Sequence, residues 1–263
     1  MRRRHQFWPA ALLVACFAAT PALAASHDFD DLLVRTSQQV SNFLEQFSDV
    51  KCTEKVTQEK LGKEGKVELK EESTYDYLVI LTNAGGELSL DESRLAVREA
   101  KSDKKNTSLL VSNGFATLFL VFHPYYAQSF RFTAQEDEVV DGHRLSKVSF
   151  RHIPGTRSMA ALALRGREYP LELSGTAWID PPTGVITKII ADIGDTMQDV
   201  GLKTLHSEVE YAPVPFRGMK VTYWFPAQAS VDVETPRQHW RNTHHFMDYK
   251  RFSVDTEEQV AKQ

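Results

Sequence analysis

Three histidines near the end of the chain are the residues whose type suits metal binding. His239, His244 and His245 lie in a segment that we expect to be a β-strand, where neighbouring side chains point to opposite faces. His244 and His245 therefore cannot ligate one ion together, and the chain contains no His-Glu-x-x-His motif or paired-cysteine spacing. We predict no metal site and no cofactor.

The sequence also lacks a recognisable nucleophile. It has no Gly-x-Ser-x-Gly elbow, and Asp180 and Asp192 fit a turn and a strand edge. We assign no catalytic residue and expect a binding protein, not an enzyme. An uncharacterised hydrolase stays as an alternative, because a catalytic triad is defined by its arrangement in space and not by its order in the chain.

Apolar binding is the chemistry that the residue types favour. The chain holds more large aromatic side chains than a thin sheet-on-helix core obviously needs. We predict that they line a concave cavity, in which a ligand gains about 0.8 kcal/mol for each methylene removed from water. The alternative is that each ring only fills the core. The predicted cavity residues are Phe115, Leu118, Phe119, Phe122, Phe130, Phe132, Trp178, Tyr223 and Trp224.

A further apolar run, 159–164, lies between Arg157 and Arg165. One interpretation is a mobile lid, or a patch that touches a membrane or partner with arginines near phosphates. The other is a buried strand or a loop that covers the core. The sequence leaves both open.

The first 24 residues have the form of an export signal. Arg2, Arg3 and Arg4 precede an apolar run over 7–19, and a small-x-small pattern at 22–24 predicts cleavage between Ala24 and Ala25. The apolar run is too short to span a membrane. We therefore expect the mature protein in the periplasm or outside the cell.

Cysteine placement leaves one question about anchoring. The sequence over 13–16 resembles a lipobox, in which Cys16 would be acylated and tether the protein to a membrane. The residues after Cys16 stay apolar, which favours a chance cysteine inside the signal and a diffusible protein. After cleavage at Ala24 only Cys52 remains, so no internal disulfide forms, and we expect Cys52 to be a small buried residue.

Charge narrows the choice of partner. Cleavage of the signal removes three arginines and no acidic residue, so the net charge of the mature chain changes from −4 to −7. An acidic surface repels phosphate backbones, so we expect no nucleic-acid partner. The remaining 239 residues can bury a sizeable core.

The elements that must position these residues follow from periodicity. Apolar residues from Phe29 to Phe47 recur every three or four positions and predict a long helix, and a short apolar helix is predicted over 115–122, before Pro124. Period-two alternation predicts strands elsewhere. The expected strands are 54–60, 66–82, 87–98, 129–133, 144–152, 175–180, 185–193, 203–211, 219–225, 227–234 and 239–252.

No linker or repeat divides the chain. We predict a signal peptide over 1–24, one domain over 25–252 and a polar tail over 253–263. The fold class is α+β, with a strongly curved antiparallel sheet, an unclosed barrel or half-barrel, wrapped around the long helix and the short apolar helix. We expect a monomer.

This pattern resembles the LolA–LolB-like superfamily of periplasmic lipoprotein carriers and receptors. The resemblance rests on Asp141-Gly142-His143-Arg144, on Gly175-Thr176-Ala177-Trp178-Ile179-Asp180 with Thr183-Gly184, and on the closing strands from Tyr211 to Phe252. It implies an unclosed barrel in which helices plug an apolar cavity that holds acyl chains. The chain departs from these carriers in an inserted segment over 154–173.

Taken together, the sequence predicts an exported envelope protein that binds a lipid, an acyl chain or a lipidated peptide as a carrier or sensor. The alternative from another class is an interaction or regulatory module that contacts an envelope protein without bound lipid. A hydrolase comes third.

Overall fold

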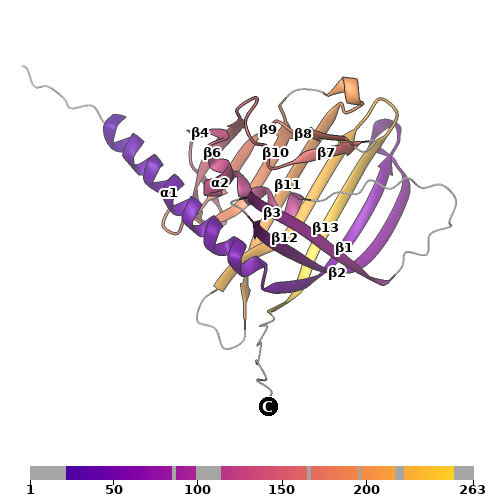
Figure 1. Cartoon of the computed structure of the whole chain (residues 1–263), viewed down its shortest axis with the longest axis horizontal. Helices are drawn as coiled ribbons and strands as arrows, with labels where there is room; N and C mark the ends of the chain where they lie inside the picture. Colours follow the sequence, from indigo (N-terminus) through magenta and orange to yellow (C-terminus); the bar gives the residue numbers. More distant parts are fainter. Residues whose placement is uncertain are drawn as a thin grey trace, which may run out of the picture.

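Eleven strands form one antiparallel sheet in the computed structural model, which describes residues 22–84, 87–98, 114–164, 167–194, 197–216 and 222–251 (Figure 1). The spatial order is β3-β2-β1-β13-β12-β11-β10-β9-β6-β4, with β5 paired to β6. The strands are β1 (Val50–Leu61), β2 (Val67–Ala84), β3 (Glu87–Arg98), β4 (Phe130–Ala134), β5 (Glu138–Val140), β6 (His143–His152), β9 (Leu173–Ile179), β10 (Ile186–Ile193), β11 (Thr204–Pro215), β12 (Thr222–Glu234) and β13 (His239–Arg251).

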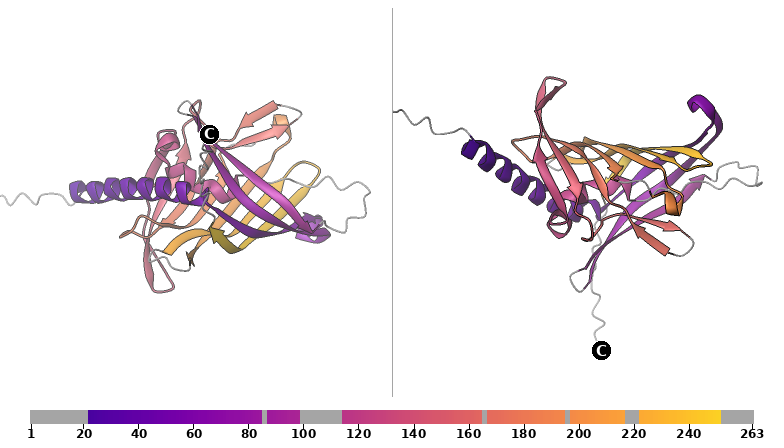
Figure 2. Two further views of the ribbon diagram at one scale, coloured as in Figure 1. Left: turned by 60° about the horizontal axis from the view of Figure 1, so that its bottom comes forward. Right: turned by 90° about the horizontal axis from the view of Figure 1, so that it is seen from above.

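The sheet is strongly curved and not closed. The first strand, β1, pairs with the last, β13, while β3 and β4 form the two edges. Figure 2 shows the sheet bent around a concave side, into which the C-terminal half of α1 (Ala22–Phe47) enters. The predicted fold class is confirmed.

Helix α1 covers part of the concave face with one apolar stripe. Its buried positions, four or three residues apart, are Leu32, Thr36, Val40, Leu44 and Phe47. The spacing matches the period of an α-helix, so one stripe can face the sheet while charged residues face solvent. Figure 1 shows the N-terminal part of α1 projecting beyond the sheet.

The second predicted helix has the expected bounds but is a 3₁₀ helix, η2 (Phe115–Phe122). Its residues from Leu118 to Phe122 are all at most 3% exposed, because they face α1 and strands β10, β11 and β12. Pro124 ends this helix and begins a short helix, α2 (Pro124–Ala127), as expected of a residue that suits the first helical turn.

One strand prediction was wrong at a proline. The segments expected as two strands, over 219–225 and 227–234, form the single strand β12. Pro226 lies opposite Tyr211, where the pairing register with β11 shifts. A register shift interrupts the regular hydrogen-bond ladder, so a residue without an N–H group is tolerated there.

The segment over 154–173 contains a hairpin that stands apart from the main sheet. Strands β7 (Ala161–Leu164) and β8 (Arg167–Pro170) pair only with each other among the described residues. Met159 and Ala160, just before β7, pack partly buried against the core. Residues 161–164 thus form a strand, but Ala161 is exposed, so the prediction of a buried strand is not confirmed, and the lid interpretation stays untested. Two short 3₁₀ turns, η1 (Lys63–Gly65) and η3 (Gln198–Val200), complete the described elements.

Aromatic rings form two groups in the core. Phe43 and Phe47 of α1 pack against Phe225 of β12, with the three ring centroids 5.2 to 5.5 Å from one another. Phe122 stacks on Phe132 at 5.0 Å near the other edge of the sheet. In the part of the chain that the structure describes, no helix is long and apolar enough to cross a membrane.

Gly184 fixes how closely α1 approaches the sheet. It lies in the turn between β9 and β10 with φ +74°, and a Cβ placed on it would lie 2.8 Å from backbone atoms of Arg35 and Thr36. Backbone atoms cannot rotate away as a side chain can. Gly184 lies in a turn and has a positive φ, as predicted. Its lack of a Cβ also allows α1 to pack closely against this turn.

We predict that Gly184→Ala destabilises the fold by about 1–3 kcal/mol more than Gly155→Ala, because a methyl group would overpack α1. Gly155 is the matched control, since it has φ +77° but a Cβ placed on it would meet nothing within 4 Å. The measurement is the free energy of unfolding in urea. Equal losses in the two variants would show that α1 does not press on this turn.

Candidate functional site

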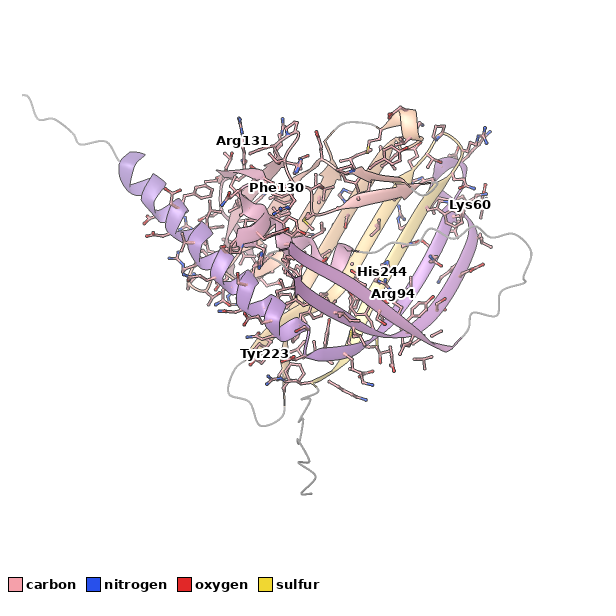
Figure 3. All side chains as sticks on the ribbon, in the orientation of Figure 1. Lys60, Arg94, Phe130, Arg131, Tyr223 and His244 are labelled. Atoms are coloured by element: carbon pink, nitrogen blue, oxygen red, sulfur yellow. The ribbon has the colours of Figure 1, made fainter. Side chains whose placement is uncertain are left out.

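A cavity of about 270 Å³ opens between the C-terminal half of α1 and the concave face of the sheet. Its walls come from α1, η2, the turn before β10, and strands β10, β11 and β12. Tyr223, labelled in Figure 3, lies at this end of the molecule, near the C-terminal end of α1. The cavity therefore lies where the helices and the curved sheet meet.

The buried part of the cavity lining, which we call its floor, is aromatic. The ring of Phe119 stands at right angles to that of Phe43, with centroids 4.5 Å apart, and Tyr211 lies 6.3 Å from Phe119. Phe119 and Tyr211 are 2% and 7% exposed. Burial raises the pKa of Tyr211, whose hydroxyl also hydrogen-bonds the backbone of Phe119, so this phenol stays neutral.

The mouth of the cavity is polar but uncharged. Helix α1 contributes Gln39, Asn42 and Gln46 to the lining, and β12 contributes Thr222. Gln39, Asn42 and Thr222 are exposed, and Gln46 is half-buried. None of the described residues that line the cavity carries a charge.

Three of the nine predicted cavity residues line this cavity, namely Phe119, Tyr223 and Trp224. Phe115 begins η2 and Leu118 lies in its middle, with Leu118 buried in the core. Phe122, Phe130 and Phe132 form part of the second aromatic group near β4. The ring centroids of Phe130 and Phe132 lie 6.4 Å apart. Phe122 and Phe130 are buried in the core and Phe132 packs partly buried against it, as the core-filling alternative describes. Ligand binding itself stays a prediction.

Trp178 lies on the opposite face of the sheet. Its neighbours Ala177 and Ile179 are fully buried, so alternation along β9 places Trp178 outward. There its ring lies 5.3 Å from Lys147 Nζ and 5.6 Å from Lys188 Nζ, and its Nε1 donates to Glu138. Its assignment to the cavity was wrong, because the pattern of large side chains in β9 does not show which face is buried.

A buried group of charges on the inner face of β1, β3 and β13 was not predicted from the sequence. Arg94 donates from Nε to Glu54 Oε2 at 2.6 Å and from Nη2 to Glu54 Oε1 at 3.0 Å, and His244 Nδ1 lies 2.8 Å from Glu54 Oε1. Arg94 also pairs with Glu92 at 3.0 Å, and Glu92 accepts the Gly114 N–H at 2.7 Å. Figure 3 shows Arg94 and His244 close together. We call Glu54, Glu92, Arg94 and His244 the buried charge cluster.

Opposing effects set the pKa values of the two acids. Burial alone would raise the pKa of Glu54, but hydrogen bonds from His244 and Arg94 outweigh it and hold this pKa below its usual value. For Glu92 burial prevails and raises the pKa, although Arg94 and the Gly114 N–H oppose the effect. Glu54 is therefore the anion that balances Arg94. A glutamate in a strand of alternating apolar and polar residues was the only sequence signal for this cluster.

Cys52 lies on the same inner face, two residues before Glu54. It is 3% exposed and free, which confirms the prediction of a buried small residue. Burial raises the pKa of its thiol to about 12, although a hydrogen bond with Tyr249 acts in the opposite direction. A thiol in this state is a poor nucleophile.

The histidines do not gather around one point. His244 is buried in the charge cluster, His245 faces the other side of β13, and His239 Nε2 lies 2.6 Å from Asp232. Among the described residues there is no group of three or more His, Cys, Asp or Glu side chains suited to a metal ion. Asp192 pairs with His206 at 2.7 Å and Asp180 accepts the Thr183 N–H within its turn, as a strand-edge and a turn acid would. Cys16 lies outside the described residues, as does the tail over 253–263.

Comparisons with known proteins give structural similarity only. No family model and no curated protein matches the chain. A crystal structure of a DUF1329 family protein from Desulfovibrio piger aligns over 88% of this chain and 93% of its own, at 13% identity and a TM-score of 0.41. A putative outer membrane lipoprotein-sorting protein domain from Vibrio parahaemolyticus aligns over 87% and 95%, at 11% identity and a TM-score of 0.40. Values this low do not assign a function.

We predict that Glu54→Gln lowers the free energy of unfolding by about 3–5 kcal/mol, because it leaves Arg94 with its guanidinium largely buried and without its main counter-charge. The measurement is equilibrium unfolding in urea at neutral pH. Glu72→Gln is the matched control, since Glu72 pairs with Lys70 at 2.8 Å on an exposed surface, and no change in its unfolding midpoint is expected. If the unfolding midpoint of Glu54→Gln were also unchanged, this result would contradict a structural role for the cluster.

The difference in stability between the wild type and Glu54→Gln should depend on pH. Because the folded-state pKa of Glu54 lies below its usual value of 4.5, the ionised carboxylate stabilises the fold above that value, and this contribution is lost as the pH falls through the folded-state pKa. Unfolding curves recorded at a series of acidic pH values should therefore converge for the two proteins. A difference that stays constant down to the lowest pH would contradict the lowered pKa.

Proposed function

We propose that this protein is an exported envelope protein that shelters one acyl chain of a lipid or lipidated peptide, as a carrier or sensor without catalytic activity. The cavity beside α1 carries this proposal. It combines an aromatic floor at Phe119 and Tyr211 with an uncharged mouth, which is the combination typical of sites for apolar ligands.

The size of the cavity limits what it holds. Pockets for drug-sized ligands measure about 300–1,000 Å³, and this one has about 270 Å³. One acyl chain is the appropriate occupant, and a lipid with several chains would need α1 to move outward. Export rests on the arginine start, the apolar run and the small residues over 22–24.

A second candidate function is supported by the edge strand β3. Leu95 and Val97 on this strand are 63% and 60% exposed, and apolar side chains on an open edge favour contact with another protein. An interaction module of the envelope would use this edge and carry no lipid. The experiment below separates the two candidates.

We expect the purified protein to release a bound amphiphile on solvent extraction, identified by mass spectrometry, and to bind a fluorescent fatty-acid probe. Val185→Trp should weaken probe binding about tenfold, because its ring would take the place of about two methylenes in the cavity. The measurement is the dissociation constant of the probe, obtained from a fluorescence titration.

Trp178→Ala is the control, since Trp178 lies on the other face of the sheet, and it should bind the probe as the wild type does. A protein that yields no lipid and binds no probe would reject the carrier proposal and favour the interaction module. Equal weakening by both substitutions would place the ligand outside the cavity.

A further inference from the structure

The mouth of the cavity has a composition that is unusual for this acidic protein. A quarter of the chain is charged, yet none of the described lining residues is. Instead, three carboxamides come from one face of α1, since Gln39, Asn42 and Gln46 stand at i, i+3 and i+7. Over seven residues a helix rises about 10 Å, so the three amides form a row of that length along the mouth.

These carboxamides are available to a ligand. None of the three makes a side-chain hydrogen bond with a residue that the structure describes, and two of them are exposed. Each carboxamide offers two N–H donors and a carbonyl acceptor. A bound head group with both kinds of partner replaces water there without breaking an existing contact within the protein.

Strand β12 adds to the lining of the same cavity. Thr222 and Tyr223 line it from β12, and Phe119, which is 2% exposed, lines its buried part. A chain that enters the floor leaves its head between the row of amides and β12. The head then meets neutral donors and acceptors, and among the described residues that line the cavity no cation neutralises an anionic group.

We propose that the cavity selects a single-chain amphiphile whose head is uncharged and carries amide or ester carbonyls, with Gln39, Asn42 and Gln46 as the residues that determine specificity. This inference rests on the proposed function. An N-acyl peptide and a monoacylglycerol both have the required chemistry, and the two sources are separate arms of the test.

Among the described residues near the cavity, Arg35 would favour an anionic head group. It lies one turn before Gln39 on α1, outside the cavity lining, and its Nε is buried without a hydrogen-bond partner among the described residues. A fatty-acid carboxylate that reached Arg35 would gain a charge-assisted bond. The test therefore includes a carboxylate of the same chain length.

The experiment measures displacement of a neutral fluorescent acyl probe from the full-length mature protein at neutral pH by three competitors with twelve-carbon chains. They are an N-dodecanoyl glycinamide, a monododecanoylglycerol and dodecanoate, each below its micelle concentration. We expect both neutral competitors to bind at least about tenfold more tightly than dodecanoate, because the carboxylate loses hydration without a counter-charge among the described lining residues, whereas the neutral heads lose less and still bond to the amides.

Variants assign the preference to the row of amides. The triple variant Gln39→Ala, Asn42→Ala and Gln46→Ala should lose about tenfold in affinity for the neutral competitors and leave dodecanoate unchanged. Alanine is a good helix former, so α1 should persist. Gln38→Ala is the matched control, because Gln38 is exposed on the same helix but does not line the cavity.

The outcomes separate this inference from the proposed function. If the three competitors bind equally, or the triple variant changes nothing, the head selectivity is wrong and the acyl-binding cavity stands. If dodecanoate binds most tightly and Arg35→Gln removes that advantage, the preference is for an anion and our inference is overturned. If no competitor and no probe binds, both proposals fail.

Discussion

The fold depends on covering the concave face of one long curved sheet. The inward side chains of its central strands are almost all buried and apolar, and an open sheet of this length cannot shield them by pairing its own edges. Helix α1 and the 3₁₀ helix η2 provide that cover. The contact at Gly184 brings α1 so close that its backbone touches the β9–β10 turn. The cavity is the space that remains where α1, η2 and the sheet meet.

The buried charge cluster stabilises the other end of the same surface by a different kind of interaction. A buried ion pair often contributes little more than apolar residues of similar volume would, but it is specific for position. A one-residue slip of β3 would turn Arg94 to the outer face and leave Glu54 without its bidentate partner. We infer that the cluster fixes the register of the edge strands, and through Glu92 and Gly114 it also ties the start of η2 to β3.

The 3₁₀ helix η2 thus contacts both the buried charge cluster and the cavity. Its N-terminal end is held by a carboxylate of the charge cluster, and its middle residue Phe119 forms the floor of the cavity. The cluster itself lies apart from the cavity lining, so its perturbed pKa values have a structural explanation and need no catalytic one. The uncharged described lining and the aromatic floor are the features that support the proposed ligand binding.

The sequence by itself determined the curved antiparallel sheet, the long helix and the bounds of η2, because hydrophobic periodicity distinguishes helices from strands. It did not determine which rings meet. Phe119, Tyr223 and Trp224 converge from segments about a hundred residues apart, whereas Trp178 points outward although its strand was correctly predicted. The partnership of Glu54, Arg94 and His244 was equally hidden, since pairing between β1 and β13 joins the two ends of the domain. Only the tertiary structure decides such contacts, because strand order and the direction of curvature are properties of the whole sheet and leave no local pattern in the chain.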